Sequence, residues 1–91
     1  MRVEEFKLSV VGMDVTRRLF MRSQGELFPL TTYELEDNIV YLMSGEALET
    51  ALQLETILNF LDNQELIGID AEKQFFPIYG YRVENNYLIL G

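Results

Sequence analysis

The chain of 91 residues contains no cysteine, no histidine and no tryptophan. Without cysteine there is no disulfide and no thiolate nucleophile. Without histidine there is no imidazole base, no serine–histidine pair and no zinc site of the usual kind. These absences remove most of the common catalytic chemistry. We therefore expect a protein that is not an enzyme and that binds no cofactor.

Long apolar runs are missing as well. No stretch approaches the roughly 18 consecutive apolar residues that a membrane-spanning helix requires. The first residues, MRVEEFKLSV, place two glutamates where a signal peptide has its apolar region. The lack of cysteine also fits a reducing compartment. The sequence thus predicts a cytoplasmic location and no association with a membrane.

Basic residues are scarce and unevenly distributed. Seven basic side chains face fifteen acidic ones, which gives a net charge of −8. Residues 23–72 contain eleven acids and no base, whereas residues 1–22 contain five bases and three acids. A surface of this kind attracts basic partners and repels nucleic acid. It also simply keeps a small protein soluble. We expect a protein partner with a basic surface and no direct binding of nucleic acid.

The apolar residues, 48% of the chain, are enough for one modest core. We expect a single domain over residues 1–91. Alternation of Phe6, Leu8 and Val10 with polar residues predicts a first strand. Residues 15–22 fit a strand or a short helix, and the β-branched and aromatic residues there favour the strand. Five later segments also have the composition or alternation of strands, namely residues 27–35, 39–43, 66–70, 75–83 and 87–90.

A long helix is predicted over residues 45–61. Ser44 is a suitable N-cap, and glutamates follow in the first turn. Apolar residues recur at helical spacing along this segment, at Ala47, Ala51, Leu54, Ile57, Leu58 and Leu61. The predicted fold is α+β, a single domain with a mostly antiparallel sheet of five to seven strands and one long central helix packed on it. If residues 15–22 were helical, a ferredoxin-like βαββαβ fold with a terminal strand would result.

Two groups of carboxylates are candidates for metal binding or catalysis. Glu34, Glu36 and Asp37 surround a predicted turn, but their spacing matches no calcium-binding loop. Glu72 and Lys73 follow a strand, as in metal-dependent nucleases, yet adjacent residues of a strand point to opposite faces. We therefore assign neither a metal site nor a catalytic site.

The remaining candidates form surfaces for a partner. The predicted acidic contacts are Glu34, Glu36, Asp37, Glu49 and Glu55. The predicted apolar or aromatic contacts, which could also join two copies of the chain, are Leu48, Leu52, Phe60, Tyr79, Tyr81 and Arg82. Tyrosine beside arginine is typical of interface centres. The basic cluster of Arg17, Arg18 and Arg22 is expected to pair with the chain's own acids or to support self-association.

The sequence therefore favours a small acidic interaction module that binds and regulates or inhibits a partner protein. A homo-oligomeric structural or assembly subunit, for example a homodimer sealed through the wide apolar face of the predicted helix and an open sheet edge, is the alternative. An enzyme that uses carboxylates and tyrosines ranks third, because catalysis requires groups that this chain lacks.

Overall fold

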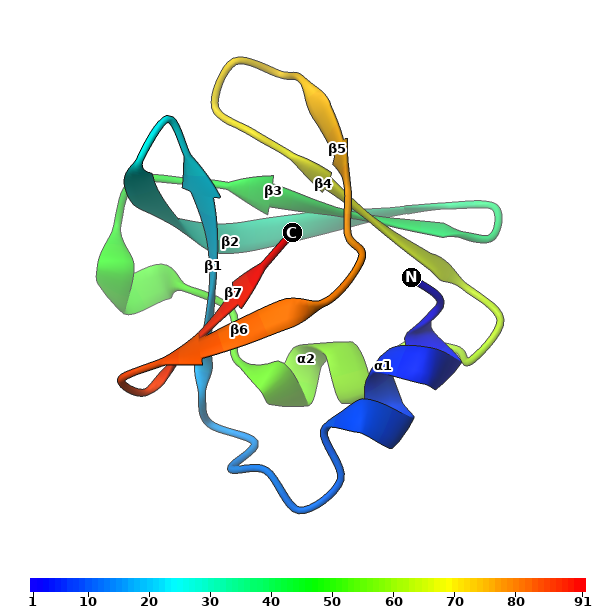
Figure 1. Ribbon diagram of the computed structural model, residues 1–91. Coiled ribbons are helices and arrows are strands. Elements are labelled where there is room, and N and C mark those ends of the chain that lie inside the picture. The colour runs from blue at the N-terminus through cyan, green and yellow to red at the C-terminus, as the bar shows by residue number, and fades with distance from the viewer.

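The backbone forms one curled, mixed sheet of seven strands with two short helices, seen in a computed structural model that describes residues 1–91 (Figure 1). The strands are β1 (Arg18–Ser23), β2 (Glu26–Glu36), β3 (Ile39–Ser44), β4 (Glu65–Ile69), β5 (Phe75–Pro77), β6 (Tyr81–Glu84) and β7 (Tyr87–Leu90). The helical elements are α1 (Val3–Ser9), the 3-10 turn η1 (Leu48–Thr50) and α2 (Leu54–Leu58).

The strand order is β5-β4-β3-β2-β1-β7-β6. The pairs β1–β7 and β3–β4 are parallel and the other four are antiparallel. The two edge strands, β5 and β6, are consecutive in the chain, so the sheet curls into a half-barrel in which residues 78–80 join one edge to the other (Figure 1). Ile78 in this connection is fully buried, which closes the core at the seam.

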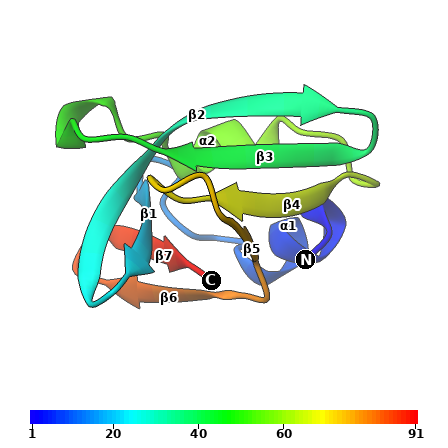
Figure 2. The same cartoon turned by 90° about the horizontal axis from the view of Figure 1, so that it is seen from above.

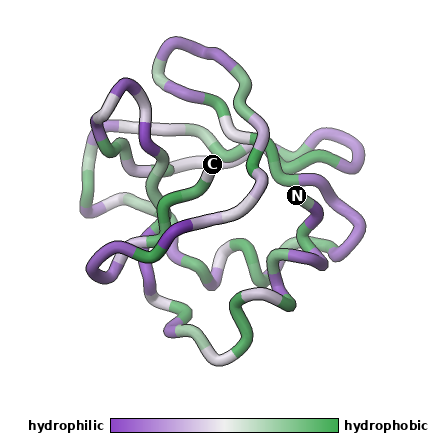
Figure 3. The backbone as a smooth tube through the Cα atoms, in the orientation of Figure 1, coloured by the Kyte–Doolittle hydropathy of each residue, from purple (hydrophilic) through white to green (hydrophobic).

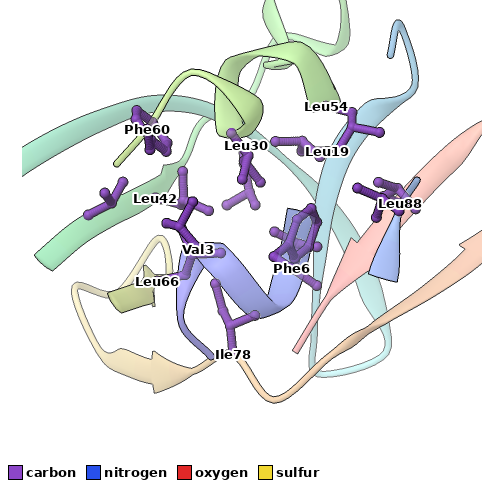
Figure 4. Packing of buried hydrophobic residues seen from close by; sticks show 14 of the residues in the cluster. Val3, Phe6, Leu19, Leu30, Leu42, Leu54, Phe60, Leu66, Ile78 and Leu88 are labelled. Carbon is purple, nitrogen blue, oxygen red and sulfur yellow. The ribbon is translucent and has the colours of Figure 1, made fainter. Parts of the chain in front are cut away.

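The core lies on the concave, inner face of the sheet. Helices α1 and α2 lie behind β2, β3 and β4 when the sheet faces the viewer (Figure 2). Side chains from both helices and from most strands meet there in one cluster (Figure 4). Its fully buried members include Val3, Phe6, Leu19, Leu30, Val40, Leu42, Leu54, Ile57, Leu66, Ile78 and Leu88. The inner face is thus filled by the chain itself.

The first element is a helix, so the predicted first strand is wrong. The helical spacing of Val3 and Phe6 in α1, and of Val10 directly after it, places all three in the core, with exposed fractions of 0%, 0% and 4%. Leu8, predicted to share the face of Phe6, is 71% exposed. The Glu5 side chain accepts a hydrogen bond from the Arg2 backbone N–H at 3.1 Å, which ties down the first turn.

The long helix over residues 45–61 is also wrong, because that stretch contains only η1 and the five-residue α2. Between them the chain is extended, and Leu52 pairs with two strands at the point where β1 and β2 separate. The Leu52 N–H donates to the Leu30 carbonyl at 2.7 Å, and the Leu52 carbonyl accepts from the Leu19 N–H at 2.8 Å. These hydrogen bonds replace those of a helix.

The fold class therefore needs correction from α+β to a mostly-sheet domain of seven mixed strands without a central helix. The ferredoxin-like alternative is wrong too, because residues 18–23 form β1 rather than a helix. The strands predicted at 27–35, 39–43, 66–70 and 87–90 are confirmed to within a residue or two as β2, β3, β4 and β7. The long strand at 75–83 is two strands, since Ile78 turns into the core between β5 and β6.

Candidate interaction surface

Three of the predicted acidic contacts lie together on the β2–β3 hairpin. Glu34 and Glu36 are exposed residues near the end of β2, and alternation places them on the same face. Asp37 follows in the turn with a φ of +54°, a conformation that aspartate tolerates better than most residues. The tip of this hairpin is hydrophilic (Figure 3). None of the three carboxylates takes part in a salt bridge.

The other two predicted acidic contacts lie elsewhere. Glu49 belongs to η1, which lies at the opposite end of the sheet from the tip of the β2–β3 hairpin (Figures 1 and 2). Glu55 is exposed in the first turn of α2, on the helix side of the molecule. The five predicted acids thus do not form a single patch. The hairpin carries the one group of them that is brought together.

Most carboxylates of the acidic segment, residues 23–72, have no ionic partner. Asp62 contacts the Lys7 Nζ atom at 2.7 Å, and Glu65 contacts the N-terminal ammonium at 2.7 Å. The other two ion pairs join arginines to Glu84, which lies outside this segment. The negative charge of the segment is therefore largely uncompensated within the fold.

The basic cluster is not used to neutralise the acidic segment. The Arg17 guanidinium donates to the Asn85 carbonyl at 3.2 Å, and the Arg18 guanidinium donates to the Leu48 carbonyl at 2.9 Å. Only Arg22 pairs with a carboxylate, and its partner is Glu84 at 3.2 Å. Two of the three arginines therefore cap backbone carbonyls, which satisfies those oxygens without cancelling acidic charge.

Three of the predicted apolar contacts have structural roles. Phe60 is 7% exposed and belongs to the core, where its ring lies 4.9 Å from that of Tyr33. Leu52 packs against the same core. The Tyr81 hydroxyl donates to the Ser9 carbonyl at 2.8 Å, and its ring packs on Phe6. These side chains hold elements of the protein together rather than forming a free surface.

The other three are exposed, and two of them lie together. Tyr79 and Arg82 line, together with Tyr81, a shallow pocket of about 540 Å³ beside β6 and the C-terminal residues. Leu48, which is 54% exposed, lines a different pocket of about 440 Å³ next to Arg18 and Tyr87. The helix that was predicted to unite Leu48 with Leu52 does not form. The predicted contacts therefore do not form one patch: Tyr79, Tyr81 and Arg82 share a pocket, and Leu48 lies in another.

An apolar surface that the sequence pattern did not predict lies on the convex, outer face of β3, β4 and β5. The strand register aligns Tyr41, Ile67 and Pro77 in one row across these strands. It aligns a second row in the same way, formed by Met43, Ile69 and Phe75. Their neighbours along β3 and β4 are the buried inner residues Val40, Leu42 and Leu66, so these rows point outward. With Ile39 they make up what we call the outer apolar face.

The outer apolar face is bordered by the acidic hairpin. Glu34 lies opposite Tyr41 and Glu36 lies opposite Ile39 in the pairing of β2 with β3. On the other side of Ile39 the register places Glu65 of β4. The segments IVYLM and LIGI are apolar on both of their faces, a pattern that is the same whether one face or both faces of the strand are covered. The apolar residues of the outer face can be read from the sequence, but only the sheet topology shows that this face is left open.

One carboxyl group has a clearly shifted pKa. The Thr16 hydroxyl donates to the Asp14 carboxylate at 2.7 Å and the Thr16 N–H donates to it at 2.9 Å. These two hydrogen bonds, the hydroxyl first, lower the pKa of Asp14 below its ordinary value. Asp14 lies in the exposed loop between α1 and β1, where this arrangement stabilises a turn.

Comparison with protein-family models, with curated proteins and with solved structures gives no match. The regulatory or inhibitory role expected from composition therefore has no support from relatives. No helix of the chain has the length and apolar character needed to cross a membrane. No group of three or more carboxylates is arranged to hold a metal ion.

Proposed function

We propose that this protein binds a partner protein that has a basic surface. The observation that supports this most strongly is the acidic segment, residues 23–72, which contains no lysine or arginine and whose carboxylates are mostly without ionic partners. Unpaired charge of one sign has a repulsive cost for the folded chain. Binding of a basic partner would reduce the repulsion among these carboxylates, and this reduction would contribute to the affinity.

The β2–β3 hairpin is the part of the segment best placed to meet the partner first. Glu34, Glu36 and Asp37 are exposed on it, and the hairpin extends beyond the helices (Figure 1). Charges in such a position steer diffusional encounter and set its salt dependence. The same charges repel the phosphates of nucleic acid and of anionic lipid, which makes a protein the proposed partner.

The homo-oligomeric alternative is weakened by the fold. It relied on the apolar face of a long helix together with an open sheet edge, and that helix does not form. Two copies that approached through their acidic segments would also bring like charges together. We therefore propose that the partner is a different protein and not a second copy of this chain. We also propose that binding takes place in the cytoplasm, a reducing compartment where proteins rarely have disulfides.

Affinity capture from a lysate of the protein's native cells, with matched variants as bait, tests the proposal. The wild-type protein is compared with the triple variant Glu34→Gln, Glu36→Gln, Asp37→Asn and with a control that removes equal charge elsewhere, Glu46→Gln, Glu49→Gln, Glu55→Gln. We expect the wild type and the control to retain the same protein at low salt and to lose it near 0.5 M salt, where screening extends to only a few ångströms. We expect the hairpin variant to lose it at low salt. Retention by all three proteins, regardless of salt, would contradict the proposal.

A further inference from the structure

We propose that the outer apolar face is the docking site for the basic partner, and that this partner presents an apolar centre flanked by lysine or arginine. The inference rests on the proposed function and adds the location of the site and the chemistry of the surface that fits it. The juxtaposition that supports it is an uncovered apolar sheet face with carboxylates along one side.

The outer apolar face is not a part of either buried cluster of the protein. Its residues are Ile39, Tyr41, Met43, Ile67, Ile69, Phe75 and Pro77, and none belongs to the main core or to the smaller second cluster. Five of the seven are only half-buried, because their neighbours in the sheet cover their sides. Phe75 is 69% exposed. Contiguous apolar residues on the open face of a sheet are typical of binding sites.

The other half of the convex face, on β1 and β7, is covered by another segment of the chain. There Phe20 of β1 and Ile89 of β7 point outward, as the register of these strands requires. Ala51, from the segment between η1 and α2, packs on them and all three are buried, with exposed fractions of 1%, 7% and 7%. No comparable segment packs on β3, β4 and β5. The protein thus covers one half of its convex face and leaves the other open.

The size of the open half suits the centre of an interface. Four neighbouring strands span about 14 Å, and the five residues 39–43 span a similar length along β3. That area is well short of the roughly 800 Å² per partner that a standard interface buries. The partner must therefore also contact the surroundings of the face, where the carboxylates lie.

The charges around the outer apolar face favour one kind of partner over another. Glu34 and Glu36 adjoin Tyr41 and Ile39 on the β2 side and have no ionic partner, whereas Glu65, beside Ile39 on β4, is already paired with the N-terminal ammonium. No lysine or arginine occurs in any of these rows. A second copy of the chain would set carboxylates against carboxylates, whereas a partner with flanking bases would pair with them. Charge complementarity therefore favours a basic partner over self-association.

Two synthetic peptides of equal positive charge test the site. One alternates leucine with lysine, so that it has an apolar side and a basic side, and the other is oligolysine. Titration of each into ¹⁵N-labelled protein gives the affinity and the amides that shift. We expect the leucine–lysine peptide to bind at least tenfold more tightly and to shift amides of β3, β4 and β5. Phe75→Ser, or Ile67→Thr as a second variant, should abolish this advantage, whereas Leu48→Ser on η1 should preserve it.

The alternative outcomes separate the two proposals. Equal binding of both peptides, with shifts confined to the β2–β3 hairpin, would overturn the docking site and leave the proposed function standing. Failure of both basic peptides to bind would count against the proposed function itself. Concentration-dependent shifts of β3, β4 and β5 in protein without peptide would show that a second copy occupies the face, which would overturn the basic partner as its occupant.

Discussion

Tyr41 and Phe75 lie on the convex side of the sheet with their ring centroids 5.7 Å apart. They belong to β3 and β5, which are not neighbours, so the contact passes over β4 and its two outward isoleucines. Aromatic rings provide a large contact area at a low cost in side-chain entropy, which is why they are frequent in interface centres. The pair lies within the outer apolar face, where the proposed partner would contact it.

The adjacent residues Phe75 and Phe76 should respond oppositely to substitution. Phe75 is 69% exposed, so we expect Phe75→Ser to lower the free energy of unfolding by less than about 1 kcal/mol. Phe76 points to the inner side and packs against the core, so Phe76→Ser should cost about 2 kcal/mol or more. Urea unfolding measures both. A larger loss for Phe75→Ser than for Phe76→Ser would mean that the faces of β5 are assigned the wrong way round.

The first helix provides a second matched pair. Phe6 is fully buried and Leu8 is 71% exposed. We expect Phe6→Ala to destabilise the protein by about 3–5 kcal/mol and Leu8→Ala by less than about 0.5 kcal/mol. A strand over these residues would bury both side chains on one face. Comparable losses in thermal or urea unfolding would therefore support that strand and contradict α1.

The strands were predictable where the local signals and the fold agree. The turns at Gly25 and at Asp37 use residues that tolerate positive φ, with φ values of 83° and 54°, so the composition favours turns at these positions. The segment 45–61 was not predictable in this way. Its leucines have helical spacing, but Leu52 forms backbone hydrogen bonds with Leu19 and Leu30, which are distant in the sequence. Such non-local pairing overrides helical propensity.

The part of the candidate site that depends only on local sequence was predictable. Charge counting finds Glu34, Glu36 and Asp37, because a surface hairpin needs no tertiary information to be exposed. It does not show that Tyr41 and Ile67 face outward, since a strand that is apolar on both faces has the same pattern whether one or both faces are covered. That distinction depends on where the helices pack, and both pack on the inner face.

Gly68 should tolerate no side chain. A Cβ atom at this position would overlap the ring of Phe76, which covers Gly68 across the β4–β5 pair. We expect Gly68→Ala to destabilise the protein by about 1–3 kcal/mol, because the ring has to leave its place. Gly80→Ala is the control, since no atom lies within 4 Å of the added methyl group. Equal thermal stability of the two variants would contradict the placement of Phe76.

Acidification should weaken the turn at Asp14. The hydrogen bonds from Thr16 lower the pKa of Asp14 in the folded protein, so its stabilising contribution is present above the unfolded-state pKa and is lost as the pH falls through the folded-state pKa. Thermal unfolding from about pH 6 to pH 2 should therefore show a steeper loss for the wild type than for Asp14→Asn. Thr16→Val, which removes the hydroxyl donor, should fall between them. Identical pH profiles would refute the assignment.

If the carboxylates of β2 and the outer apolar face bind one partner as one surface, substitutions in both must weaken binding of the same ligand. The most direct test is the calorimetric Kd of the leucine–lysine peptide for four proteins, namely the wild type, Phe75→Ser, the double variant Glu34→Gln with Glu36→Gln, and all three substitutions combined. We predict that Phe75→Ser and the double variant each weaken binding about 5–10-fold, equivalent to roughly 1–1.4 kcal/mol, and that the combination weakens it further. An unchanged Kd in all three variants would contradict the account.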